Sequence, residues 1–103
     1  MINLKKNELN KVINSTENVL IFFSAEWCSP CKLLKLNLEK IEETKREYKF
    51  VKIDVSEDEE SIDKFKIRNI PTVILIKNKK EIARFLGARP PEHIKKFFDE
   101  HAN

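Results

Sequence analysis

Apolar and polar positions divide the first half of the chain into a strand followed by a helix. The run VLIFF within residues 18–24 is apolar at every position, which is typical of a central strand buried on both faces, as in parallel pairing. After Pro30, apolar side chains recur at helical spacing, at Leu34, Leu38 and Ile41. Proline suits a first helical turn because its missing N–H needs no partner there. The pattern therefore predicts a buried strand that leads directly into a long helix.

Shorter patterns before and after this unit predict further elements. Residues 1–4 are expected to form an edge strand, and Asn7 to cap a first helix. Residues 49–55 predict the next strand, and Ser56 with Glu59 forms a capping-box pattern for a short helix. The inner faces of these two helices are expected to carry Leu9, Val12 and Ile13 in the first, and Ile62 and Phe65 in the second.

The C-terminal part predicts a hairpin and a last helix. Residues 72–76 and 81–86 read as antiparallel strands, Gly87 ends the second, and Pro90 and Pro91 open the helix. One face of this helix is expected to carry Ile94, Phe97, Phe98 and His101. The resulting order, β-α-β-α-β-α-β-β-α, requires right-handed crossovers. It predicts an α/β fold with a mixed sheet covered by helices on both faces.

Length and composition fit one compact domain. The 103 residues suit a single core, so we expect one domain over residues 1–103. With 41% hydrophobic and 36% charged residues, the composition is that of an ordered chain. No apolar run approaches the ~20 residues that span a membrane. The start, MINLKKNELN, lacks the apolar region and cleavage site of a signal peptide. We therefore expect a cytoplasmic protein that does not bind membranes.

Charge and glycine content argue against two classes of function. The 20 basic residues are mixed with 17 acidic ones and form no stripe with interleaved aromatics, so we expect no nucleic-acid binding. The single glycine excludes Gly-rich phosphate loops, and with them nucleotide binding by those routes.

Cys28 and Cys31, in SAEWCSPCK, are the only cysteines, and they allow three interpretations. A zinc site needs four ligands, and the two histidines, His93 and His101, are eight residues apart in one expected helix. We therefore expect no metal. A structural disulfide is disfavoured because the expected compartment is reducing and a four-residue loop stabilises little.

The third interpretation, a redox pair, fits the local pattern. Cys28 falls at the strand-to-helix junction, where unpaired N–H groups and the helix dipole favour the nucleophilic thiolate. Cys31 lies one turn further on, more buried, and is placed to attack a mixed disulfide formed at Cys28. Pro30 fixes the turn between them. CxxC beside a βαβ pattern is a redox signature, so a working dithiol is predicted.

The sequence resembles the thioredoxin family from about Leu4 to the C-terminal helix. AEWCSPCK is similar to the family's AEWCGPCK, with Ser29 in place of glycine. IRNIPTVILIKN, residues 67–78, resembles the segment around the family's cis-proline, which is Pro71 here. LGA, residues 86–88, resembles the surface that borders the family's active site.

The resemblance implies a thioredoxin fold, with a central mixed sheet of four to five strands flanked by four helices. It implies reversible exchange with protein disulfides, in which Cys28 attacks and Cys31 resolves, and no cofactor beyond this redox-active disulfide. It also implies a monomer and a flavin-containing reductase as electron donor. The substrate-docking surface that it implies comprises Trp27, Ile70, Pro71, Gly87 and Ala88. For Trp27 the alternative is core packing.

The chain departs from the family beside the cysteines. Phe22 stands where the family has a buried acid that accepts the proton of the second cysteine, here Cys31. Lys52, which matches the lysine near that acid, loses its partner, and its stem is expected to pack while its ammonium reaches solvent. Ser24 replaces an aromatic residue. Three proton acceptors stay open for Cys31: Glu26 through water, solvent, or the departing thiolate.

Two further functions stay open beside the reduction of protein disulfides. Ser29 could hydrogen-bond a sulfur and change the redox potential, which would suit an oxidase or isomerase. Alternatively, the fold could serve as a binding subunit in which redox activity is secondary.

Overall fold

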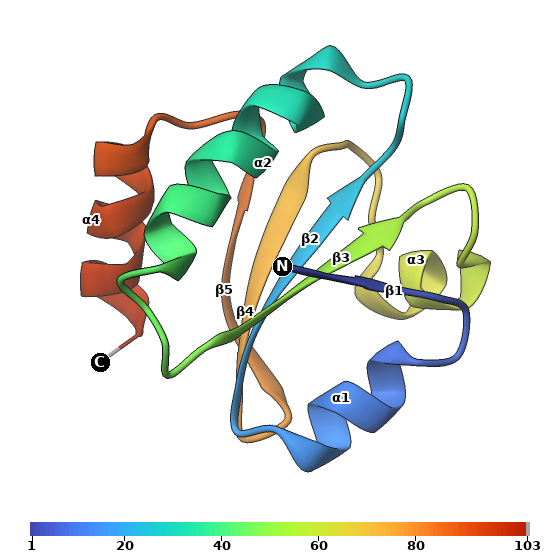
Figure 1. The fold of residues 1–103 in the computed structure, drawn as a ribbon. Helices are drawn as coiled ribbons and strands as arrows, with labels where there is room; N and C mark the ends of the chain where they lie inside the picture. The colour runs from blue at the N-terminus through green and yellow to red at the C-terminus, as the bar shows by residue number, and fades with distance from the viewer. Residues whose placement is uncertain (103) are drawn as a thin grey trace.

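A computed structural model describes residues 1–102 of the chain and shows a five-stranded sheet with four helices (Figure 1). The elements follow one another in the predicted order. They are β1 (Ile2–Leu4), α1 (Leu9–Ser15), β2 (Asn18–Ser24), α2 (Ser29–Glu42), β3 (Lys49–Asp54), α3 (Glu59–Phe65), β4 (Thr72–Lys77), β5 (Lys80–Leu86) and α4 (Pro91–His101). The predicted thioredoxin fold with a mixed sheet is confirmed.

The strand order in the sheet is β1-β3-β2-β4-β5, so β2 lies at the centre. It pairs in parallel with β3 and antiparallel with β4, and β5 is antiparallel to β4. The expected parallel pairing of β2 thus holds on one side only. In this register Phe22 lies opposite Lys52 of β3 and Val73 of β4.

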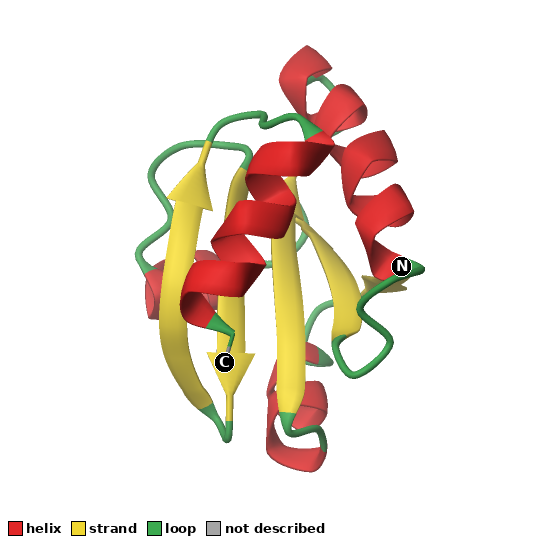
Figure 2. Ribbon diagram, turned by 90° about the vertical axis from the view of Figure 1, so that its left-hand side faces the viewer, coloured by secondary structure: helices red, strands yellow, loops and turns green. Residues whose placement is uncertain are grey.

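The sheet carries an apolar layer on each face, and Figures 1 and 2 show the helices divided between them. Leu20 and Phe22 of β2 belong to the layer under α2 and α4, which also contains Cys28 and Cys31. The alternate β2 side chains, Val19, Ile21 and Phe23, pack in the layer with α1 and α3. Side chains of a strand point to opposite faces in turn. The uninterrupted VLIFF run is therefore explained by two covered faces.

Two predicted helix caps are wrong in detail. Asn7 does not cap α1: the helix starts after Glu8 without a side-chain cap, and Asn7 has a φ of 71°. In α3 the cap is Asp58, whose Oδ1 accepts from the backbone N–H of Ser61 at 3.1 Å. Ser56 instead bonds Asp54. An aspartate one residue before the helix offered the same cap chemistry as the expected capping box, so the sequence pattern alone was ambiguous.

Candidate redox site

The two cysteines form a disulfide across the first turn of α2. Cys28 is the N-cap residue, with extended backbone, and its Sγ accepts a hydrogen bond from the backbone N–H of Cys31 at 3.2 Å. Pro30 lies in this first turn, as predicted. The sulfur therefore takes up one of the N–H groups that a helix start leaves without a partner.

Burial differs little between the two cysteines in this disulfide form. Cys28 is 5% exposed and Cys31 is 3% exposed. Cys31 is thus the more buried of the two, as expected, but only slightly. The neighbouring Trp27 is 75% exposed, which excludes core packing for its side chain. The backbone N–H of Cys28 donates to the carbonyl of Ala25 at 3.2 Å, and this turn links β2 to α2. A largely buried disulfide thus lies beside the solvent-exposed indole of Trp27.

The peptide bond between Ile70 and Pro71 is cis, as the family resemblance implies. The Pro71 carbonyl accepts a hydrogen bond from the N–H of Gly87 at 2.9 Å. This bond connects the residue before β4 to the residue after β5. Gly87 has a φ of +81° with no atom near its missing Cβ. The position therefore favours glycine for its backbone conformation and not for lack of space.

The structure brings together part of the predicted docking surface. Trp27 and Ile70 line one shallow depression with a volume of about 190 Å³. Pro71 and Gly87 are joined by the hydrogen bond above, and Ala88 follows Gly87 as an exposed residue. The remaining residues of the depression are Val55, Ile62, Ile67, Arg68 and Asn69.

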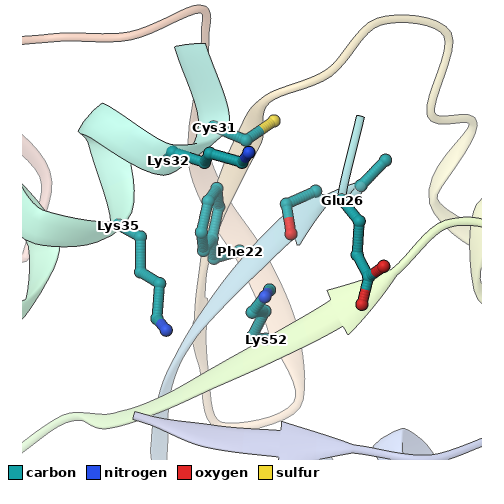
Figure 3. Close-up of a pocket in the computed structure, with 8 residues that line it drawn as sticks. Phe22, Glu26, Cys31, Lys32, Lys35 and Lys52 are labelled. Atoms are coloured by element: carbon teal, nitrogen blue, oxygen red, sulfur yellow. The ribbon is translucent and has the colours of Figure 1, made fainter. Parts of the chain in front are cut away.

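A larger cavity, of about 340 Å³, is lined by Cys31 and lies apart from this depression, with which it shares no lining residue (Figure 3). Phe22 reaches it from β2 and is fully buried. Glu26, from the loop after β2, is the one acidic residue among those that line it. Lys52 faces it from β3, half-buried, with no carboxylate in ion-pair distance among residues 1–102.

Sequence reasoning missed two residues of this cavity and one contact. Lys32 and Lys35 line the cavity from α2, and the signal was available because Lys35 is four residues after Cys31, on the same helix face. Asn37 is buried, and its Nδ2 donates to the carbonyl of Arg89 at 3.0 Å. This bond holds the segment after Gly87 against α2, and no local pattern indicated it.

The structure also bears on Ser29, on metal binding and on membrane spans. Ser29 is exposed, and its hydroxyl makes no hydrogen bond to a sulfur in residues 1–102. Within the same residues no group of three or more His, Cys, Asp or Glu side chains is placed to hold a metal ion. No helix in the described chain is long and apolar enough to cross a membrane.

A CxxC disulfide at the start of a helix, in a fold whose mixed sheet has a cis-proline directly before one strand, defines a class of protein: thiol–disulfide oxidoreductases that use CxxC. The thioredoxin family model matches residues 1–100. The thioredoxin of Mycoplasmoides gallisepticum is 34% identical over 90 residues, covering 87% of this chain and 90% of the relative. Thioredoxin-1 of Saccharomyces cerevisiae is 36% identical over 84 residues, or 82% of each chain.

Comparison with solved structures gives the same family. A Plasmodium falciparum thioredoxin superposes with a TM-score of 0.90 at 30% identity, covering 97% of this chain and 98% of the other. The Fasciola hepatica thioredoxin gives a TM-score of 0.89 at 31% identity, with 98% and 99% covered. The chain belongs to the thioredoxin family, and it is a thiol–disulfide oxidoreductase.

Proposed function

We propose that the chain reduces protein disulfides with Cys28 as nucleophile and Cys31 as resolving cysteine. In the dithiol form, the Cys28 thiolate attacks a substrate disulfide, forms a mixed disulfide and releases one substrate thiolate. Cys31 then attacks Cys28 Sγ, which releases the second thiolate and restores the Cys28–Cys31 disulfide. The observation that carries this assignment is the place of Cys28 as N-cap, where its Sγ accepts the Cys31 N–H.

Docking of the substrate is proposed to use Trp27, Ile70, Pro71, Gly87 and Ala88. An exposed indole provides apolar contact area beside the disulfide. The cis bond before Pro71 turns the chain next to the depression that Ile70 shares with Trp27. An extended substrate segment would pair with the Ile70 backbone by β-addition.

We propose that Glu26, acting through a water molecule, accepts the proton of the Cys31 thiol. Phe22 has no acceptor group, and Lys52 as an ammonium has none either. Glu26 and Cys31 line the same cavity, and its volume exceeds what several water molecules need. Of the three acceptors open from the sequence, this one has a position in the structure that supports it.

The wider setting is also a proposal. One domain over residues 1–103 would act as a cytoplasmic monomer and would be reduced again by a thioredoxin-reductase-type donor. No nucleic-acid or membrane partner is proposed. Electron transport and redox homeostasis follow from the same cycle of reduction and oxidation.

The test is reduction of insulin disulfides with dithiothreitol as donor. Wild type is expected to turn over, and Cys28→Ser to lose turnover, since its thiolate starts the cycle. A redox titration against glutathione, on the same preparation, separates a reductase from an oxidase or isomerase. Turnover by Cys28→Ser at the wild-type rate would exclude the proposed mechanism. A wild type no faster than dithiothreitol alone would favour a role as a binding subunit.

A further inference from the structure

The cavity beside Cys31 has an unusual balance of charge. The groups with formal charge that line it are three lysines and one glutamate. Figure 3 shows Lys32 and Lys35 extending from α2 and Lys52 from β3, with their side chains around the Phe22 ring. Among residues 1–102, none of the three ammonium groups has an ion-pair partner. The cavity therefore has two uncompensated positive charges.

Ser24 supplies a second, independent feature. It lines the same cavity and is 1% exposed, and its Oγ has no hydrogen-bond partner in residues 1–102. Buried hydroxyls are nearly always paired in folded proteins, because an unpaired one is unfavourable. The Ser24 hydroxyl is therefore available to donate to a ligand in the cavity, directly or through one water.

Size and polarity limit the ligand. The cavity volume is about 340 Å³, and the Phe22 ring closes part of its wall. Lysine ammonium groups bind oxyanions as point charges, and each brings three N–H donors. We propose that this cavity binds a small dianionic oxyanion with the chemistry of phosphate, held by Lys32, Lys35 and Lys52 with Ser24 as a further donor. The two negative charges of this anion would balance the two uncompensated positive charges of the lining residues.

Binding in this cavity would change the redox equilibrium, a step that rests on the proposed function. Reduction of the disulfide adds two electrons and one proton and gives one thiol and one thiolate. The bound dianion repels this new negative charge, whereas the disulfide is neutral. The oxidised form therefore binds the anion more tightly, by about threefold or more for charges within ~7 Å. By linkage, the anion favours the disulfide by the same factor.

Binding is tested first, on the oxidised protein without substrate. Inorganic phosphate is titrated into ¹⁵N-labelled protein at neutral pH, with sodium chloride keeping the ionic strength constant. Saturable shifts are expected for amides around the cavity. Lys35→Met is expected to weaken binding by about tenfold and Ser24→Ala by about threefold. Lys11→Met, an exposed lysine of α1, is the matched control and should bind like wild type.

Three outcomes would overturn the site. They are the absence of saturable shifts, equal affinity in wild type and both cavity variants, and sodium acetate binding as tightly as phosphate. The last would contradict the match to a dianion. Because this titration needs no turnover, its failure is distinct from failure of insulin reduction, which tests the proposed function alone.

The coupling is tested by the reduction potential against glutathione, with and without saturating phosphate at equal ionic strength. A threefold preference for the oxidised form lowers the potential by about 14 mV, since tenfold corresponds to 29.6 mV for two electrons. Ser24→Ala with Lys35→Met should abolish this shift. A potential that stays constant or rises in wild type would contradict the coupling.

Discussion

At Phe22, the central strand has an apolar ring where the cavity beside Cys31 meets the core. The ring is fully buried and faces α2. Phe22 therefore cannot accept the Cys31 proton, and the acceptors that remain are Glu26 through water, solvent, or the departing thiolate. Two substitutions test these routes. Phe22→Asp adds a carboxylate to the cavity from the strand, and Glu26→Gln removes the carboxylate that the loop provides.

Phe22→Asp is expected to raise the rate of the resolving step and to lower stability. The new carboxylate would accept the Cys31 proton, but it would also be buried in a site that holds a phenyl ring. We expect a loss of about 3 kcal/mol or more in the free energy of unfolding. Insulin reduction against pH, measured on folded protein, is the readout, with Phe22→Leu as control. No gain in rate from the carboxylate would show that its absence does not limit turnover.

Glu26→Gln is expected to slow the same step by up to about 100-fold, since the amide cannot accept the proton. Glu57→Gln is the matched control, because Glu57 is an exposed carboxylate of the neighbouring depression that does not line the cavity with Cys31. Rapid-mixing measurement of mixed-disulfide resolution gives the rate directly. Equal rates for the two variants would exclude Glu26 as acceptor and leave solvent or the departing thiolate.

At the scale of the elements, the contacts of α2 and α4 decide how firmly the site is held. Asn37 connects α2 to the segment between Gly87 and α4 through the Arg89 carbonyl. The Arg89 guanidinium also lies over the Phe85 ring, 4.4 Å from its centroid. The proposed docking residues Gly87 and Ala88 thus sit on a loop fixed from both sides.

Asn37→Ala is expected to loosen this loop and weaken docking. Loss of one buried hydrogen bond should lower stability by about 1–2 kcal/mol, and KM for a protein disulfide should rise more than kcat falls. Asn10→Ala removes an exposed amide contact on α1 and serves as control. If KM is unchanged while stability falls, Asn37 has no part in docking.

Tyr48 offers a test of the layer under α4. Its ring contacts Phe98 edge-on at 5.2 Å, and its buried hydroxyl has no partner in residues 1–102. Burial, with a smaller effect of the Glu47 charge, raises the pKa of Tyr48 above its ordinary 10.0. The neutral phenol is thus favoured in the folded state, and stability falls as the pH rises through this range.

Tyr48→Phe is expected to keep the ring contact, to gain about 1 kcal/mol in the free energy of unfolding, and to lose less stability above pH 10. Urea unfolding at neutral and alkaline pH measures both effects. Tyr48 is the only tyrosine, so its ultraviolet titration in wild type reports this group alone. A destabilised Tyr48→Phe variant would show that the hydroxyl has a partner in solution.

For the whole molecule, the oxidised form is expected to be more stable than the dithiol form. The disulfide closes a four-residue loop, and loop entropy of this size corresponds to about 2 kcal/mol, the low end for disulfides. Guanidinium unfolding with and without a reductant measures the difference, and Cys28→Ser with Cys31→Ser shows the effect of reductant itself. Equal midpoints for the oxidised and reduced wild type would contradict this estimate.

Much of this molecule follows from its sequence, because strong local patterns agreed with the global fold. The VLIFF run, the helix after Pro30 and the CxxC pair each predicted the element that is found. The antiparallel partner of β2 and the bond from Asn37 to Arg89 join segments far apart in the chain, so no local pattern indicated them. The predicted cap of α3 was wrong because Asp58 carries the same cap chemistry as Ser56, whereas α1 has no side-chain cap.

The central claim, that Cys28 attacks and Cys31 resolves, is tested most directly by trapping the mixed disulfide. Cys31→Ser, presented with a protein disulfide, is expected to accumulate a covalent adduct through Cys28, which mass spectrometry locates after digestion. Cys28→Ser is expected to form far less, because only Cys28 is the N-cap residue, where a helix N–H bonds its Sγ and favours the attacking thiolate. An adduct at Cys31 in Cys28→Ser that forms as fast as the one at Cys28 in Cys31→Ser would contradict the assignment.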